Sequence, residues 1–156
     1  YSHGYLFGTN VDPTLTPQQQ EQALAGKLLP NDVTNDNPSW SWAAGGAIST
    51  AQDLATYVEA LVGGRLLSSE MHQKQLASIR PNEPDNPQSA GYGLGMAKLG
   101  PMLGHDGSLP GYQSFMGHDP QTGLTLIVLT NLQASPSGRQ TANILAKSIL
   151  DEMAAQ

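Results

Sequence analysis

Hydrophobic residues recur at helical spacing in the middle of the chain and predict two helices there. The first helix is marked by four apolar residues on one face: Leu54, Tyr57, Val58 and Leu61. We expect it to begin at Ser49, with Gln52 completing a capping box, and to stop at residues 63–64, a pair of glycines. Ser68 is predicted to cap the second helix, which has three apolar contacts: Met71, Leu76 and Ile79.

From residue 92 onward the pattern changes to short β segments, and we expect strands at residues 92–96, 102–105, 112–118 and 124–129. Residues 119–123 have the composition of a hairpin turn, because proline presets φ and glycine takes the left-handed position. The last strand is apolar, which predicts burial on at least part of both faces. A final helix is predicted to start at Ser135-Pro136 and to lay one apolar stripe on the sheet: Ala142, Leu145, Ala146, Ile149, Leu150 and Met153.

Residues 1–42 differ in composition from the rest of the chain, because they contain several prolines and many Asn, Asp and Gln residues. We expect a loop-rich excursion there, with a short strand at 5–8 and a helical turn or two within 18–28. Residues 43–91 then form a helical part, and residues 92–156 form a sheet with a C-terminal helix. The order predicts an α+β fold, in which an antiparallel meander is covered by the C-terminal helix.

Composition excludes several classes of function. The chain of 156 residues is long enough for one real core, and it has no cysteine for disulfides or thiol chemistry. Its net charge of −6 argues against a nucleic-acid partner. Four histidines are scattered without metal-ligand spacing, so we expect no metal and no other cofactor.

The stretch 103–112 is the richest in candidate chemistry, because three glycines and a proline surround His105 and Asp106 at the start of a strand. Glycine admits close backbone approach, and histidine titrates near neutral pH. One interpretation is an edge strand that a ligand touches. The other is a glycine- and proline-containing loop that leads into a strand, with a histidine that caps or packs.

Three segments of the chain are informative in the order in which they occur. They are residues 40–54, which contain two tryptophans, then Tyr92-Gly93-Leu94-Gly95, and then residues 104–112. The third is followed by shorter matching pieces at 118–120, 123–124 and 129–131. In this order they resemble the C-terminal part of serine β-lactamase-like hydrolases, which include class C β-lactamases, D-alanyl-D-alanine carboxypeptidases and related esterases. The likeness covers about residues 38–154. It implies a β-lactamase/transpeptidase-like fold and acyl-enzyme hydrolysis of an amide, a β-lactam or an ester.

The family's nucleophile is a serine in a Ser-x-x-Lys motif, followed by a Tyr-x-Asn motif and then by Lys-Thr-Gly or His-x-Gly. This chain contains no Ser-x-x-Lys. We therefore expect it to be the C-terminal portion of a longer domain, partnered by an N-terminal portion that holds the nucleophile, and to be inactive alone. Tyr1-Ser2-His3 looks like the second motif, but Gly4-Tyr5 fits a point downstream of that motif better.

His105-Asp106-Gly107 matches the third motif. The resemblance implies that His105 supports the proton network or polarises the carboxylate side of the substrate. It also implies that Gly107 leaves room for a flat acyl group and that the Ser108 N–H is an oxyanion donor. Asp106 stands where penicillin-recognising members have small hydroxyl residues. A carboxylate there would repel the substrate's own carboxylate, unless the side chain points away as alternate strand residues do.

Two aromatic residues complete the candidate site. Trp40 aligns with a pocket-lining tryptophan of the carboxypeptidase subgroup, whereas Trp42 is expected in the core. Tyr112 either contacts the ligand or packs in the hairpin. The implied substrate is a small molecule or a peptidoglycan peptide, and the resemblance alone favours an exported or cell-envelope protein. The alternative is a non-catalytic binding module that keeps the penicillin-recognising fold without the nucleophile.

Overall fold

A computed structural model describes residues 2–9, 12, 14–86 and 89–155. The elements in chain order are β1 (Tyr5–Leu6), α1 (Pro17–Leu24), β2 (Asn31–Asp32), the 3₁₀ segment η1 (Ser39–Ala44), α2 (Ala51–Val62), α3 (Ser69–Ala77), β3 (Arg80–Pro81), β4 (Gly91–Tyr92), β5 (Ala97–Leu99), β6 (Met102–Leu109), β7 (Tyr112–His118), β8 (Thr125–Thr130) and α4 (Thr141–Ala154). The predicted α+β class is confirmed.

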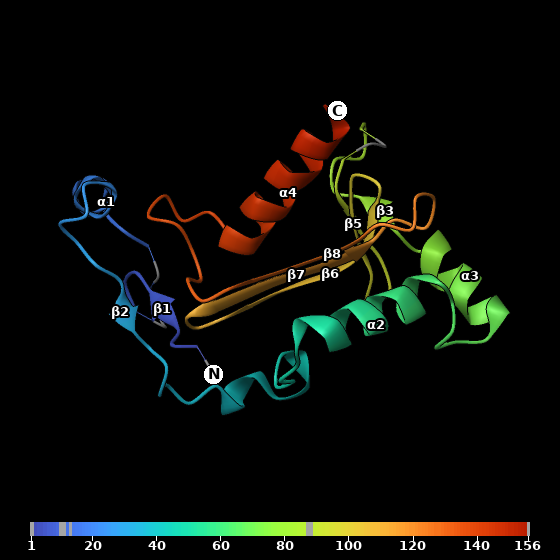
Figure 1. Cartoon of the computed structure of the whole chain (residues 1–156), viewed down its shortest axis with the longest axis horizontal. Helices are drawn as coiled ribbons and strands as arrows, with labels where there is room; N and C mark the ends of the chain where they lie inside the picture. Colours follow the sequence, from blue (N-terminus) through green and yellow to red (C-terminus); the bar gives the residue numbers. More distant parts are fainter. Residues whose placement is uncertain (1, 10–11, 13, 87–88, 156) are drawn as a thin grey trace. The chain divides into compact units, whose positions relative to one another are not determined.

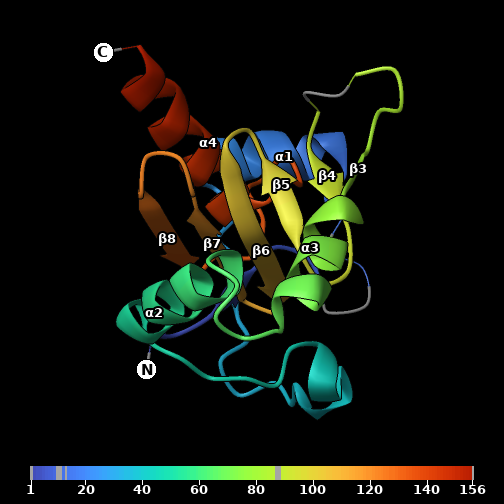
Figure 2. The ribbon, with the colours of Figure 1, turned by 90° about the vertical axis from the view of Figure 1, so that its right-hand side faces the viewer.

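The main sheet has six strands in the order β3-β4-β5-β6-β7-β8, so each strand lies beside its neighbour in sequence (Figure 1, Figure 2). The pairs β3–β4, β4–β5 and β5–β6 are antiparallel. Strands β1 and β2 form a separate antiparallel pair. The order confirms the predicted meander, and short hairpin connections are its physical basis.

The chain divides into two compact units, and each is described by itself. One comprises Tyr1–Ile48, Gly107–Ser114 and Val128–Gln156, and the other comprises Ser49–Asp106 and Phe115–Ile127. We call the first the terminal unit and the second the central unit. Strands β6, β7 and β8 each contribute residues to both.

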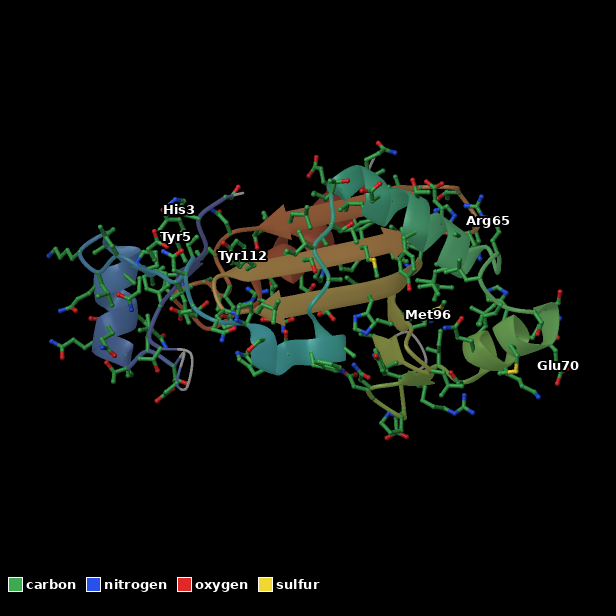
Figure 3. All side chains as sticks on the ribbon, turned by 90° about the horizontal axis from the view of Figure 1, so that it is seen from below. His3, Tyr5, Arg65, Glu70, Met96 and Tyr112 are labelled. Atoms are coloured by element: carbon green, nitrogen blue, oxygen red, sulfur yellow. The ribbon has the colours of Figure 1, made fainter. Side chains whose placement is uncertain are left out.

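The central unit has a core built from α2 and the segment before β5. Val58 and Met96 are fully buried, and Leu61 and Val62 pack with them. Figure 3 labels Met96. Partly buried side chains from α3, from the residue before β3 and from the long strands complete this core: Leu76, Ile79, Leu103, Met116 and Ile127. The predicted apolar face of α2 is confirmed at Val58 and Leu61, which are buried, and is wrong at Tyr57, which is exposed.

The terminal unit is held by contacts between residues far apart in sequence. The Tyr5 N–H donates to the Asn131 carbonyl at 2.8 Å, which fastens β1 beside the end of β8. The Gln113 side-chain oxygen accepts the Ala142 N–H at 2.7 Å, which satisfies a free amide at the start of α4. Ala142 and Ala146 are fully buried.

The starts of the predicted helices are partly corrected. Helix α2 is capped by Thr50 and not by Ser49, because the Thr50 hydroxyl accepts the Asp53 N–H at 3.1 Å. Ser68 caps α3 as predicted, accepting the Met71 N–H at 3.4 Å. Met71 itself is exposed, so its predicted core contact is wrong.

Helix α4 begins at Thr141, five residues after the predicted first helical residue Pro136. The prediction failed because Ser135 closes a turn, in which its carbonyl accepts the Gly138 N–H and its own N–H donates to Arg139. The expected stripe is buried only at its alanines. Its large members Leu145, Ile149 and Met153 are exposed.

The strands also differ at their ends. Strand β7 has the predicted bounds, but β6 runs to Leu109, four residues beyond the prediction, before a two-residue turn leads to β7. The predicted strand at 92–96 is instead the end of β4 and a turn, with Gly95 at φ +64°. The hairpin at 119–123 is as predicted: the Thr122 hydroxyl and the Gln121 N–H donate to Asp119 and lower the pKa of its carboxyl.

Candidate active site

Strand β6 carries the His105-Asp106-Gly107 motif on a stretch that extends past its neighbour β5. The β5–β6 pairing ends where Ala97 meets Gly104. Strand β6 continues to Leu109, and within the described residues no strand pairs with residues 105–109 on the β5 side. We call this stretch the open edge. An edge that no neighbouring strand covers is a place where an extended ligand can add as a further strand.

The two hairpins decide which backbone groups face the open edge. Leu99 and Met102 flank a two-residue turn, so their N–H and C=O groups point at each other. Because these directions alternate along a strand, the groups of Asp106 and Ser108 also point to the β5 side. The two-residue turn between β6 and β7 leads to the same result. The backbone groups of Leu109 point toward β7, so those of the preceding residue, Ser108, point to the opposite side. The Ser108 N–H therefore points out of the open edge.

His105 is held through both ring nitrogens. Its Nδ1 lies 2.5 Å from the Asp106 carbonyl oxygen, and its Nε2 lies 2.8 Å from the Tyr92 hydroxyl. The Tyr92 and His105 rings meet edge to face, with centroids 5.4 Å apart. A carbonyl can only accept, so Nδ1 carries a proton, and in the neutral imidazole Nε2 accepts from the tyrosine.

The Asp106 carboxylate lies near the His105 ring. Its Oδ1 is 3.9 Å from Nδ1 of His105, and the two side chains are 40% and 36% exposed, respectively. The carboxylate thus stays near the imidazole instead of pointing away from it.

Gly107 and Ser108 follow on the part of β6 that belongs to the terminal unit. A Cβ on Gly107 would lie 2.6 Å from the Ser114 hydroxyl oxygen, so that hydroxyl occupies the space a side chain would need. The Ser108 hydroxyl accepts from the Gln133 side-chain nitrogen at 3.3 Å. The Gln133 oxygen in turn accepts the Gly111 N–H at 3.3 Å, which ties the β6–β7 turn to the segment after β8.

Both tryptophans are exposed, at 68% for Trp40 and 84% for Trp42. The expectation that Trp42 is a core residue is wrong. Its backbone has φ +42° and ψ −127°, a conformation that is strained for a residue with a large side chain. Gly45 lies beside the Leu109 side chain, so η1 ends next to the end of β6.

Tyr112 donates its hydroxyl to the Ser2 carbonyl at 2.8 Å. Its ring fills the space next to Gly4, where an added Cβ would lie 2.5 Å from ring carbons. Figure 3 labels Tyr112 together with His3 and Tyr5 of the same unit. These contacts favour the packing interpretation of Tyr112 over ligand contact.

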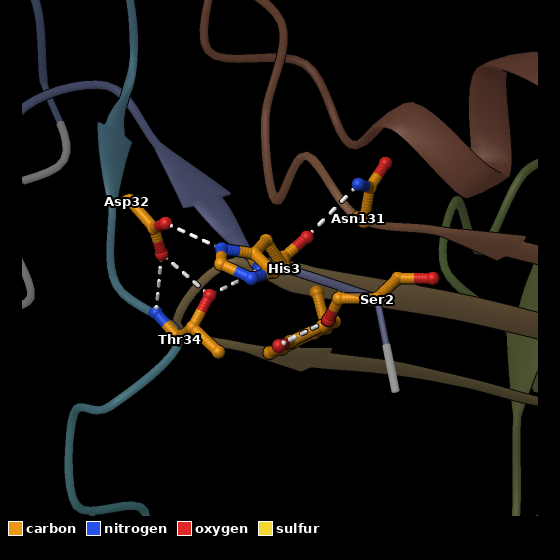
Figure 4. Close-up of polar contacts among 7 residues, drawn as sticks. Ser2, His3, Asp32, Thr34 and Asn131 are labelled. Atoms are coloured by element: carbon orange, nitrogen blue, oxygen red, sulfur yellow. Dashed lines mark hydrogen bonds and ion pairs between the residues drawn. The ribbon is translucent and has the colours of Figure 1, made fainter.

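A second polar cluster lies beside β2 (Figure 4). His3 Nδ1 is 2.6 Å from the Asp32 carboxylate, which also accepts from the Thr34 hydroxyl and backbone N–H. The Thr34 hydroxyl and then His3 lower the pKa of Asp32 to about 2. The Tyr-x-Asn comparison made for Tyr1-Ser2-His3 includes Tyr1, which lies outside the described residues.

Tyr92 is the residue of this site that sequence reasoning missed. Tyr92-Gly93-Leu94-Gly95 was recognised as a segment, but its tyrosine was given no role. No sequence pattern indicated this role, which depends on the register of the meander: Tyr92 pairs with Ala97, and Ala97 pairs with Gly104. Among the described residues no group of three or more His, Cys, Asp or Glu side chains could hold a metal ion. No described helix is long and apolar enough to span a bilayer.

Comparison with known proteins places these features in context. The family model described as Beta-lactamase matches residues 6–151. A D-stereospecific amidohydrolase from Streptomyces sp. is 29% identical, with a TM-score of 0.63 over 88% of this chain and 36% of that one. A D-amino acid amidase from Ochrobactrum anthropi SV3, complexed with L-phenylalanine amide, is 27% identical, with a TM-score of 0.60 over 85% and 35%. The chain thus spans about a third of the length of these structures.

Proposed function

The chain belongs to the beta-lactamase family, and from this premise we propose that the whole protein is a serine hydrolase that cleaves amides of D-amino acids through an acyl-enzyme. The similar solved structures are a D-stereospecific amidohydrolase and a D-amino acid amidase, which supports an amide as the bond cleaved. The observation that carries the proposal is the open edge of β6, which begins at His105.

The open edge suits an extended acyl group. A substrate backbone lying antiparallel to residues 105–109 would pair with the outward-facing backbone groups of Ser108. The Ser108 N–H, directed out of this edge, is then available to the carbonyl oxygen that becomes negative during acyl transfer. One such donor contributes about 3 kcal/mol to lowering the barrier.

The His105–Tyr92 pair can hold a proton at a defined atom. In the resting arrangement the Tyr92 hydroxyl donates to Nε2. When Nε2 receives a proton, the hydroxyl rotates and accepts instead, so the contact survives both charge states. The Asp106 carbonyl keeps the other nitrogen protonated throughout. This pair can therefore stabilise the proton that leaves the nucleophile and must reach the leaving amine.

The nucleophile is proposed to come from an N-terminal portion of the same protein, as Ser-x-x-Lys. The family's chemistry requires it, and this chain lacks the motif. We assign no metal or organic cofactor to the reaction. Ester and β-lactam substrates, peptidoglycan peptides and an exported location remain within the family's range, and the amide is the substrate class that we favour.

The test uses the full-length protein and two probes. We expect a fluorophosphonate to label one serine, and D-phenylalanine amide to release ammonia faster than its L-enantiomer does. Folded protein that neither reacts with the probe nor releases ammonia would instead support a binding module that keeps the fold. An upstream sequence without Ser-x-x-Lys would support the same alternative.

A further inference from the structure

We propose that the N-terminal portion of the same protein docks on two features of the terminal unit, the apolar stripe of α4 and the outer edge at the end of β8. This inference rests on the part of the proposed function that assigns the nucleophile to such a portion, and it names the surface to which that portion attaches. The occupant adds a strand beside β8 and packs apolar side chains on α4.

The stripe of α4 is buried at its start and exposed over the rest of its length. Its alanines are fully buried, whereas its three larger members are between 39% and 48% exposed: Leu145, Ile149 and Met153. Spacings of three and four residues place all of these side chains on one helical face. Lys147 and Asp151 pair with each other on another face, at 2.6 Å. An apolar face that continues from a buried turn to exposed turns lacks a packing partner.

Strand β8 is the outermost strand of the main sheet, as Figure 2 shows. The Leu124 carbonyl accepts the Asp119 N–H, so Leu124 faces β7, and by alternation the backbone groups of Leu129 face outward. The Asn131 carbonyl agrees with this alternation, because it accepts the Tyr5 N–H on the outer side. Within the described residues, β1 covers this side only beyond the end of β8.

The residues of β8 give this edge no protection of their own. Exposed edge strands usually carry charged residues, prolines or bulges that prevent pairing with another chain. Residues 125–130 contain neither a charged residue nor a proline, and Leu129 is half-exposed. The end of the strand is tied to the start of α4, because the Thr130 and Thr141 hydroxyls lie 2.7 Å apart. An uncharged edge and an apolar helix face so linked suit permanent cover by protein.

Length and chain direction favour the N-terminal portion as the occupant. The chain spans 36% and 35% of the two similar structures, so about two thirds of a protein of that length lies outside it. Residues 2–5 lie beside the end of β8, where the Asn131 side-chain nitrogen donates to the His3 carbonyl at 2.9 Å. A preceding segment therefore enters close to this edge. Because it is tethered, its effective concentration exceeds that of a second copy or a foreign protein.

The first experiment measures whether the stripe is covered in the full-length protein. Ile149→Cys places a thiol on the stripe, and Ser148→Cys places one on an exposed face of the same helix as the matched control. We expect iodoacetamide to modify the thiol at 149 about 10- to 100-fold more slowly than the thiol at 148, because cover removes it from water. Peptide mass spectrometry measures both rates, which should become equal in urea above the unfolding transition.

Hydrogen exchange of the full-length protein tests the edge of β8. The Val128 N–H faces β7, whereas the Leu129 N–H faces outward. If a strand is added beside β8, both N–H groups are hydrogen-bonded, and we expect their exchange rates to agree within about tenfold. Exchange of Leu129 that is faster by about 100-fold or more would show that the edge is open.

Photochemical cross-linking identifies the occupant. p-Benzoylphenylalanine in place of Met153, at the end of the stripe, should cross-link within one protein chain to peptides upstream of residues 1–156. The same probe in place of Ser148 should give no such product. A product that joins two copies of the protein would show that the stripe is a dimer interface and would overturn the proposal.

These readouts do not depend on turnover, so the two proposals fail separately. If the thiol at 149 reacts as fast as the thiol at 148, or no cross-link reaches the upstream portion, the docking proposal falls, while release of ammonia from D-phenylalanine amide would still support the amidase. If the stripe is protected and cross-linked but no amide is cleaved, the docking proposal stands and the amidase falls. A mature protein without an upstream portion would contradict the docking proposal outright.

Discussion

The Tyr92 hydroxyl lies 2.8 Å from Nε2 of His105. The histidine of the motif is therefore hydrogen-bonded to a residue of β4, a strand that is not adjacent to β6 in the sheet. Strand β5 lies between β4 and β6 but ends its pairing at Gly104. Tyr92 reaches His105 just where β5 no longer covers the edge. This relationship links the register of the sheet to the proton chemistry proposed for the site.

Replacing Tyr92 by phenylalanine should keep the edge-to-face ring contact and remove the hydroxyl. We expect kcat of the full-length protein to fall by about 10- to 100-fold and its pH profile to shift, because His105 loses a partner in both charge states. The free energy of unfolding should fall by less than about 1 kcal/mol, since the contact is exposed. Tyr57→Phe on α2 is the control. An unchanged pH profile would contradict the proposed role.

The 156-residue chain alone should not turn over nitrocefin or p-nitrophenyl acetate, because it carries no Ser-x-x-Lys nucleophile. Circular dichroism would first establish that the purified chain is folded. Hydrolysis by the isolated chain that disappears in His105→Ala would refute the need for a separate nucleophile.

Sequence reasoning located the strand of the motif and the helix before it, because both depend on local patterns. The spacing of apolar residues in α2 indicates the face that packs around Val58. The residue types at 119–123 are sufficient to indicate a turn there. Strand β7 alternates buried and partly buried residues over its whole length. Such features need no knowledge of distant contacts.

The features that failed depend on contacts between distant residues or on backbone strain. Strand β4 is two residues long, so no period could reveal that Tyr92 faces β6. Trp42 is predicted to lie in the core, but it is exposed, and no residue pattern reveals its positive φ. The start of α4 was misplaced because a proline at 136 is as compatible with a turn as with a first helical position.

Gly104 should tolerate no side chain. An added Cβ would lie 2.0 Å from the Met116 carbonyl oxygen and 3.0 Å from the Gly117 Cα, both of them backbone atoms of β7. Relief requires β6 and β7 to separate beside His105, so Gly104→Ala should lower the free energy of unfolding by about 3 kcal/mol or more. Urea unfolding measures this loss.

The matched control for that experiment is Gly45→Ala. Its added Cβ would meet the Leu109 side chain at 3.4 Å, an ordinary contact with flexible atoms, so its effect should stay below about 1 kcal/mol. Equal losses in the two variants would show that the approach of the two strands at Gly104 is not what requires glycine.

Asp32 should titrate well below an ordinary aspartate, because the Thr34 hydroxyl and then His3 donate to its carboxylate and lower its pKa to about 2. A depressed carboxyl pKa stabilises the folded state above the unfolded value of about 3.9, and the benefit is lost as pH falls through about 2. The stability difference between the wild type and Asp32→Asn should therefore shrink between pH 4 and pH 2. NMR titration of the carboxyl carbon should show a larger rise in pKa for Thr34→Val than for His3→Ala, and the reverse order would mean that His3 dominates the cluster.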